Sequence, residues 1–212
     1  MQILFDRRCK IWKCAITHED SRPVLQHILV EPDGRLVAAD GFKLAIIPCQ
    51  IDWAEGEERK QVLIHWSLFE KAVAYASTAD YDDFGGQTFT RPMPPIVVKD
   101  GKASVDLGDY SVSAPLWTAP FPGYKKLFPV VPPAAMLSQG INPRFLDGMC
   151  EALGGEGFYC TFYGPAQPIV CWPFGGDGIG LLMPMFWPKD NGEPIAALNE
   201  RLKAMTGEAV KA

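Results

Sequence analysis

One pattern of expected elements occurs three times along this chain of 212 residues. Each copy combines a helical segment with three strand-like runs, and the expected helices start near residues 6, 66 and 143. These starts define a repeat of roughly 60 to 75 residues, built as strand, helix and three strands. Repetition of such a mixed unit predicts an internally duplicated α+β fold with three units in this chain.

Turn residues separate the strand-like runs in the first two units. Asp33-Gly34, Asp40-Gly41 and Asp100-Gly101 are residue pairs that tight hairpin turns favour. The expected strands around these turns, with the strand that precedes the second helix, are LQHILVEP (25–32), RLVAAD (35–40), KLAIIPC (43–49), QVLIH (61–65), PIVVK (95–99), KASVDL (102–107) and YSVSAPL (110–116). Apolar spacing predicts a helix over WSLFEKAVAYAS (66–77). We expect the segment 77–95 that follows to be an exposed, mobile loop.

The third unit has the clearest helix signals. Asn142 is a capping residue type, Pro143 suits the first helical position, and Gly154-Gly155 ends the run RFLDGMCEAL. The expected strands of this unit are AMLSQGI (135–141), GFYCTFYG (157–164), PIVCWP (168–173) and GIGLLMPM (178–185). Within the last run, Pro184 cannot donate a ladder hydrogen bond, which predicts that it lies at a sheet edge or at the end of its own strand.

A proline-rich stretch divides the chain. We expect a complete domain over 1–120, a joint over 121–133, a half domain over 134–188 and a tail over 189–212. The tail contains the amphipathic helical pattern IAALNERLKAMTG.

The first segment carries a concentration of positive charge. Phe5, Cys9, Trp12 and Ile16 have helical spacing, which predicts a packed helix with Arg7, Lys10 and Lys13 on the neighbouring face. An ordinary basic face in contact with solvent is the alternative interpretation.

Composition excludes several classes of protein. The net charge of −5 argues against a protein that coats nucleic acid with its whole surface. No apolar run reaches the ~18 residues of a membrane span, and the charged start MQILFDRRCK does not resemble a signal peptide, so we expect a cytoplasmic protein. The six cysteines lack metal-ligand spacing, which predicts reduced thiols and no metal or cofactor.

Motifs that suggest an enzyme lack the context they require. GGDGIG (175–180) precedes an expected strand instead of a helix, so a hairpin is favoured over a phosphate site. The Asp80, Asp82 and Asp83 cluster lacks the glutamate of a calcium loop. No nucleophile or pair of carboxylates has a catalytic setting, and we expect no enzymatic activity.

Three motifs resemble the bacterial DNA polymerase III β sliding clamp. The segment ADGFKLA (39–45) resembles its TDGHRLA-type segment, FPGYKKLFP (121–129) its FPDYRRVLP joint, and LLMPMFW (181–187) its VVMPMRL terminus. They occur in the order of that family, and the resemblance covers about residues 3–187. It implies a DNA-clamp-like fold and a role in DNA replication.

The resemblance also implies a pocket for short linear motifs of a DNA polymerase and a clamp loader. Matched position by position, its residues are Leu25, Ala39, Gly41, Phe42, Lys43, Leu44, Pro122, Lys126, Leu127, Leu181, Met183, Pro184 and Met185. Methionine is flexible enough to adapt to varied peptides, which agrees with this use. Phe42 and Ala39 depart from the histidine and threonine of the family pattern, and Phe186-Trp187 replace its terminal arginine and leucine.

Clamps of this family line their central hole with helices whose basic residues meet duplex DNA without reading sequence. The residues expected to face DNA here are Arg7, Arg8, Lys10, Lys13 and Lys71, which Arg201 and Lys203 could extend. The leading hypothesis is a clamp-like processivity factor. The alternative is a peptide-binding module without a ring that competes for clamp-binding proteins.

Counting units predicts how the chain assembles. The first two units can pair as one domain, whereas the third has no partner unit and is expected to expose apolar surface. Pairing of two chains about a two-fold axis, or coverage by the tail helix, would hide this surface. We expect a homo-oligomer.

Overall fold

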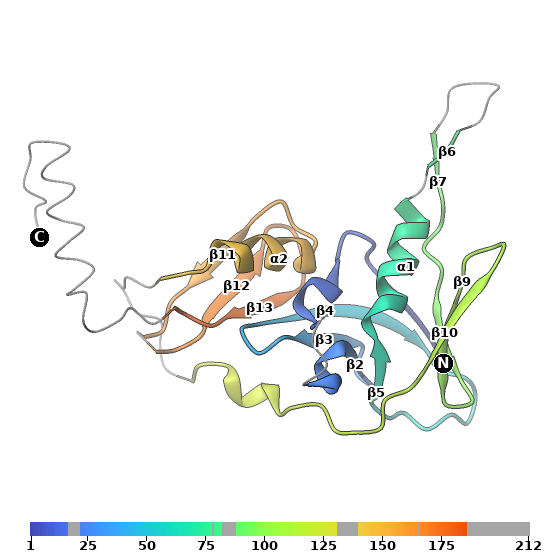
Figure 1. Cartoon of the computed structure of the whole chain (residues 1–212), viewed down its shortest axis with the longest axis horizontal. Coiled ribbons are helices and arrows are strands. Elements are labelled where there is room, and N and C mark those ends of the chain that lie inside the picture. The colour runs from blue at the N-terminus through green and yellow to red at the C-terminus, as the bar shows by residue number, and fades with distance from the viewer. Residues whose placement is uncertain (17–21, 78, 82–87, 131–139, 165, 186–212) are drawn as a thin grey trace, which may run out of the picture.

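The computed structural model describes residues 1–16, 22–77, 79–81, 88–130, 140–164 and 166–185. Most of the described strands form one eleven-stranded sheet in the order β10-β9-β8-β1-β4-β13-β12-β11, from which β3, β2 and β5 branch at β4 (Figure 1). These strands are β1 (Gln2–Phe5), β2 (His27–Glu31), β3 (Arg35–Ala39), β4 (Lys43–Asp52), β5 (Val62–His65), β8 (Ile96–Lys99), β9 (Lys102–Asp106), β10 (Ser111–Pro115), β11 (Phe158–Thr161), β12 (Ile169–Pro173) and β13 (Ile179–Leu182). Pairing within the sheet is antiparallel throughout.

Both longer helices lie where the sequence predicts them. α1 spans Trp66–Ser77 and α2 spans Pro143–Leu153. The Asn142 side chain accepts from the backbone N–H of Arg144, and Gly154 ends α2 with the left-handed φ of 71°. Local capping chemistry therefore sets both ends of α2. Short 3-10 helices are η1 (Ile11–Cys14), η2 (Pro23–Gln26) and η3 (Tyr124–Leu127).

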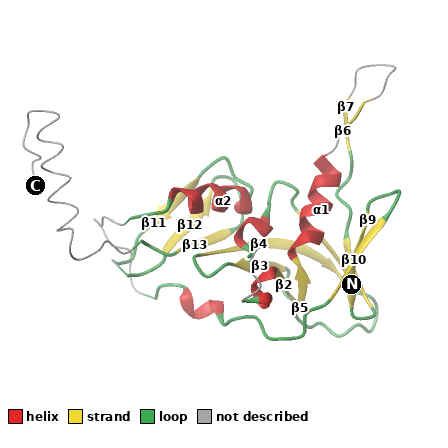
Figure 2. Ribbon diagram, in the orientation of Figure 1, coloured by secondary structure: helices red, strands yellow, loops and turns green. Residues whose placement is uncertain are grey.

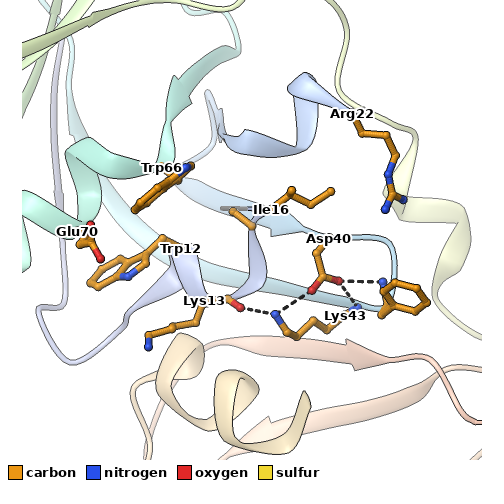
Figure 3. A pocket seen from close by; sticks show the side chains of 10 residues that line it. Trp12, Lys13, Ile16, Arg22, Asp40, Lys43, Trp66 and Glu70 are labelled. Atoms are coloured by element: carbon orange, nitrogen blue, oxygen red, sulfur yellow. Dashed lines mark hydrogen bonds and ion pairs between the residues drawn. The ribbon is translucent and has the colours of Figure 1, made fainter. Parts of the chain in front are cut away.

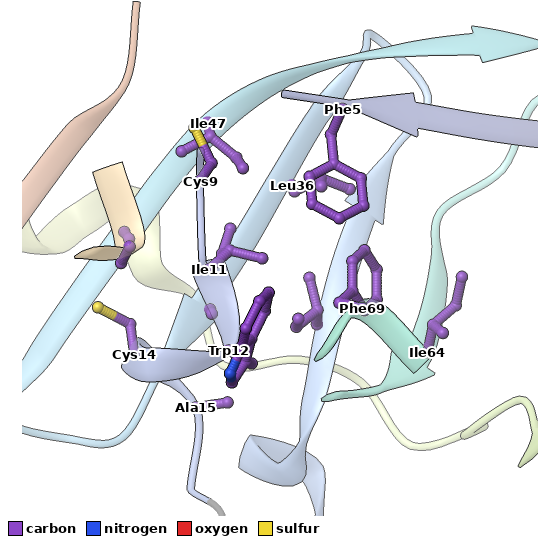
Figure 4. Packing of buried hydrophobic residues seen from close by; sticks show 14 of the residues in the cluster. Phe5, Cys9, Ile11, Trp12, Cys14, Ala15, Leu36, Ile47, Ile64 and Phe69 are labelled. Atoms are coloured by element: carbon purple, nitrogen blue, oxygen red, sulfur yellow. The ribbon is translucent and has the colours of Figure 1, made fainter. Parts of the chain in front are cut away.

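Both faces of the sheet bury apolar side chains, each against different elements. One face, here called the helix face, packs under α1, η1 and α2 through residues such as Leu36, Ile47 and Phe69 (Figure 4). The opposite face, here called the joint face, packs against the joint through Leu44, Leu181 and Tyr124. Alternation decides which residue faces which layer, because successive strand side chains point to opposite sides. Figure 2 shows α1 and α2 on one side of the sheet and η3 on the other.

The predicted helix over residues 5–16 is wrong. Phe5 belongs to β1, where it pairs with Cys49, and only Ile11–Cys14 form a 3-10 turn. Between them the Asp6 side chain accepts from the backbone N–H of Arg8, and Lys10 N–H donates to the Glu151 carbonyl of α2 at 2.8 Å. These contacts compete with helical hydrogen bonds, so the helical spacing of the apolar residues reflects burial alone.

Two further expectations need correction. The segment 77–95, expected as a loop, contains strands β6 (Ala79–Tyr81) and β7 (Thr88–Thr90), which form a separate antiparallel pair. The third unit is expected from the sequence to have no partner in the chain, and this is wrong for one side of the unit. There β13 pairs with β4 inside the sheet, whereas β11 on the other side has a described neighbour on one side only. Pro184 follows the end of β13, as the sequence predicts.

The expected strand AMLSQGI, except its last two residues, and the tail helix with Arg201 and Lys203 lie outside the described residues. No helix in the described ranges is long and apolar enough to cross a membrane.

Candidate functional site

The sheet joins two motif segments that lie far apart in the sequence. β13 pairs with the first half of β4, which places Leu181 opposite Leu44 and Leu182 opposite Lys43. Beyond β13, the backbone N–H of Met183 donates to the carbonyl oxygen of Phe42 at 2.8 Å. The ADGFKLA and LLMPM segments therefore lie side by side.

A tight turn holds the first of these segments. Oδ1 of Asp40 accepts from the backbone N–H groups of Phe42 at 2.8 Å and Lys43 at 2.9 Å, and its Oδ2 forms an ion pair with Lys43 at 2.8 Å. Gly41 has a φ of 95°, which a residue with a Cβ adopts only with strain. The turn presents the Phe42 ring, 54% exposed, whose centroid lies 5.6 Å from that of Phe145 on α2.

Contacts of Tyr124 and Glu31 hold the joint against the joint face of the sheet. Tyr124 of η3 is 5% exposed and belongs to the same apolar cluster as Leu44 and Leu181. Its hydroxyl donates to Oε2 of Glu31 at 2.7 Å, and Glu31 also forms ion pairs with Arg35 at 2.7 Å and Lys125 at 2.9 Å. Burial, reinforced by the hydrogen bond to Glu31, raises the pKa of Tyr124 well above its ordinary value. The phenol therefore remains a proton donor near neutral pH.

Neither Glu31 nor Tyr124 is among the site residues inferred from the sequence. Tyr124 lies in the quoted joint motif, and Glu31 is the acidic end of the otherwise apolar strand run HILVE. A carboxylate at the end of a buried strand predicts a hydrogen-bond donor or a cation beside it, because buried charges are nearly always paired.

The predicted pocket residues differ in burial. Leu25, Leu44 and Leu181 are buried, whereas Phe42, Leu127 and Met185 are 54%, 43% and 54% exposed. Of the others, Pro184 is buried, Ala39, Lys43 and Met183 are partly buried, and Gly41, Pro122 and Lys126 are exposed. Ala39 packs with Leu44 and Leu181 in the joint-face cluster, whereas Leu25 lies on η2 outside that cluster.

Four of the predicted residues border two different hollows, which lie on opposite faces of the sheet. A hollow of about 370 Å³ on the joint face includes Pro122 and Lys126 beside Tyr124. A hollow of about 490 Å³ on the helix face includes Phe42 and Lys43, and there the Lys43 ammonium contacts the Lys13 carbonyl oxygen (Figure 3). A third hollow of about 450 Å³ lies on the joint face between Ile46, Ile179 and Phe128.

Several of the basic residues expected to face DNA are engaged by carboxylates. Lys10 and Lys13 form ion pairs with Glu151 at 2.6 Å and 3.0 Å. Arg8 forms an ion pair with Asp6 at 2.6 Å. Hydrogen bonding by Lys10 lowers the pKa of Glu151, and hydrogen bonding by Arg8 lowers that of Asp6.

Two other basic residues of the predicted DNA-facing set, Arg7 and Lys71, are exposed. Lys71 projects from α1, whereas Arg7 lies in the turn after β1.

The fold matches solved structures of bacterial sliding clamps. A DNA polymerase sliding clamp from Bacillus subtilis matches at TM-score 0.64 and 14% identity, over 89% of this chain and 64% of that chain. The Caulobacter crescentus β sliding clamp matches at TM-score 0.62 and 17% identity, over 88% and 65%. A Pseudomonas aeruginosa sliding clamp bound to griselimycin matches at TM-score 0.59 and 15% identity, over 87% and 65%.

No protein-family model and no curated protein matches the sequence. The chain spans about 65% of the length of the clamp chains it matches. Its repeated α+β architecture is the fold of the bacterial DNA polymerase III β sliding clamp.

Proposed function

We propose that this protein is a clamp-like processivity factor of DNA replication, which tethers a polymerase to duplex DNA through a peptide-binding site at the β4–β13 junction. A short linear motif of a polymerase or clamp loader would bind there. Its apolar side chains would contact Leu127, Met183 and Met185 above the floor formed by Leu44 and Leu181. DNA would be held by sequence-independent contacts to basic residues.

The convergence of three chain segments is the observation that carries the proposal. The Asp40 turn, the joint and the segment after β13 are distant in sequence, yet hydrogen bonds and the joint-face cluster hold them together. Exposed apolar side chains on a rigid support are typical of surfaces that bind peptides. The griselimycin complex of the Pseudomonas aeruginosa clamp agrees with ligand binding on this fold.

A second candidate is a peptide-binding module that competes for clamp-binding proteins without enclosing DNA. The ion pairs of Lys10 and Lys13 with Glu151 favour it, because a carboxylate between two lysines weakens their attraction for phosphates. DNA retention separates the two candidates.

Peptide binding tests the site itself. A fluorescent peptide carrying a clamp-binding motif should bind the protein, and anisotropy should show loss of binding in Met183→Asp and in Met185→Asp. The second variant changes a side chain that is 54% exposed, so the fold is retained.

Val130→Asp is the matched control, because Val130 lies just beyond the joint motif and is 99% exposed. The control should bind the peptide as the unmodified protein does. Equal binding by all four proteins would show that the site lies elsewhere.

A further inference from the structure

The hairpin of β11 and β12 belongs to a stretch without charge. Residues 157–176 contain no aspartate, glutamate, lysine, arginine or histidine, whereas 21% of the whole chain is charged. Natural edge strands usually carry a charge, often a lysine, which opposes pairing with other chains. This hairpin lacks that protection.

Large aromatic side chains are exposed on the same hairpin. Tyr159 is 67% exposed, Trp172 44% and Phe174 50%. Tyr159 and Trp172 are cross-strand partners, and the ring centroids of Tyr159 and Phe174 lie 4.6 Å apart. Together these three residues form an exposed patch on the joint face, here called the aromatic patch.

β11 is the last strand of the described sheet at this end and has a described neighbour on one side only. Phe174 N–H donates to the Gly157 carbonyl at 2.9 Å, so Gly157 and Phe174 form a hydrogen-bonded pair. In an antiparallel ladder such pairs alternate, which directs the N–H and C=O groups of Phe158 and Cys160 away from β12. These backbone groups are placed to bond another strand.

We propose that β11 pairs with β11 of a second copy of this chain, antiparallel and about a two-fold axis normal to the sheet. Such pairing preserves the two faces, because Tyr159 of each copy stays on the joint face next to the same residue type. Cross-strand contacts would then join the two aromatic patches into one surface. The sheet would continue from one chain into the other.

Charge and symmetry favour a second copy as the partner. An uncharged strand meets no like-charge repulsion across a two-fold axis, and self-complementary pairs of this kind are the commonest oligomers. The strand at the other end of the unbranched strand order, β10, instead exposes Ser111, Ser113 and Pro115, which offer little apolar surface. The proposed interface is separated from β4 by two strands, β13 and β12, and does not depend on the proposed function.

Light scattering during size exclusion tests the interface. At micromolar concentration the protein should have twice the 23.4 kDa mass of one chain. Tyr159→Lys should reduce this mass to one chain, because it places a charge beside its own copy. Tyr110→Lys is the matched control, since Tyr110 is 61% exposed near β10, and it should stay dimeric. A monomeric unmodified protein, or a dimeric Tyr159→Lys variant, would overturn the proposal.

Hydrogen exchange locates the interface independently. Backbone amides of the peptide 156–164 should exchange more slowly in concentrated than in dilute protein. Protection that is the same at every concentration would mean that the chain covers its own edge, and it would also overturn the proposal. The Tyr159→Lys variant should still bind the clamp-motif peptide, so failure of this interface and failure of the peptide site are distinguishable.

Discussion

The hydroxyl of Tyr124 donates to Oε2 of Glu31 at 2.7 Å, which fastens the joint to the end of β2. Glu31 is 7% exposed, and its other contacts come from Arg35 on β3 and Lys125 on the joint. The carboxylate therefore links three segments at the margin of the joint-face cluster.

Removing the Tyr124 hydroxyl should destabilise the fold. Tyr124→Phe keeps the ring in its cluster but leaves the buried Glu31 carboxylate without one donor, which should cost about 2 kcal/mol of unfolding free energy. Urea denaturation measures the loss. Tyr110→Phe, at an exposed tyrosine, should change nothing measurable, and an equal effect in both variants would argue against the hydrogen bond as the cause.

Gly154→Ala should lower the stability of the fold more than the same change at another glycine with the same backbone conformation. Gly154 has a φ of 71°, and an added Cβ would lie 2.7 Å from Cys9 Sγ and 3.0 Å from the Cys9 backbone nitrogen. Gly101 has a φ of 72° but nothing within 4 Å, so Gly101→Ala should cost only the conformational strain of about 1 to 2 kcal/mol. Thermal unfolding should rank Gly154→Ala clearly below Gly101→Ala, and similar melting temperatures would contradict close packing of α2 against Cys9.

Stability should fall in mildly acidic solution because of two facing histidines. His27 and His65 are cross-strand partners with ring centroids 5.3 Å apart, and burial lowers the pKa of both. The unfolded chain therefore binds more protons below about pH 6.5, so their contribution is complete above that value and is lost as the pH falls. Melting temperatures from about pH 7.5 to about pH 5.5 measure this loss before most carboxylates titrate.

A variant assigns the pH effect. His27→Phe keeps an aromatic ring beside Trp117, whose ring centroid lies 5.0 Å from that of His27, and removes one titrating group. Its melting temperature should depend less on pH over the same range. An unchanged pH dependence would place the effect in other groups.

Removing the carboxylate of Glu151 should strengthen retention on duplex DNA if the basic residues near η1 face DNA. Glu151→Gln frees Lys10 and Lys13 from their ion pairs, and each additional lysine that reaches a phosphate should steepen the logarithmic salt dependence by about 0.9. Glu156→Gln makes the same change in net charge at an exposed residue. Retention measured on DNA beads over a salt series should increase for Glu151→Gln alone, and an equal increase for both would reflect net charge only.

Local chemistry in the sequence determined α2, several hairpins and the positions of most strands along the chain. Asn142, Pro143 and Gly154 act within one turn of the helix they bound, so their effect does not depend on the rest of the chain. The Asp100-Gly101 turn is local in the same way, with φ values of 51° and 72°. The motif resemblance also placed the Asp40 turn and the Met183 segment at one site, and the β4–β13 register brings these two segments side by side.

Tertiary contacts decided the remaining features. Phe5 and Trp12 have helical spacing, but strand pairing with β4 and contacts with α2 outweigh the weak preference of a short segment for a helix. The pairing of β13 with β4 could not be predicted from the sequence either. A strand pattern shows which face of the strand is apolar and not which strand will pair with it. The same limit applies to Glu31 and Tyr124: 93 residues separate them, and only the folded chain brings the carboxylate and the hydroxyl together.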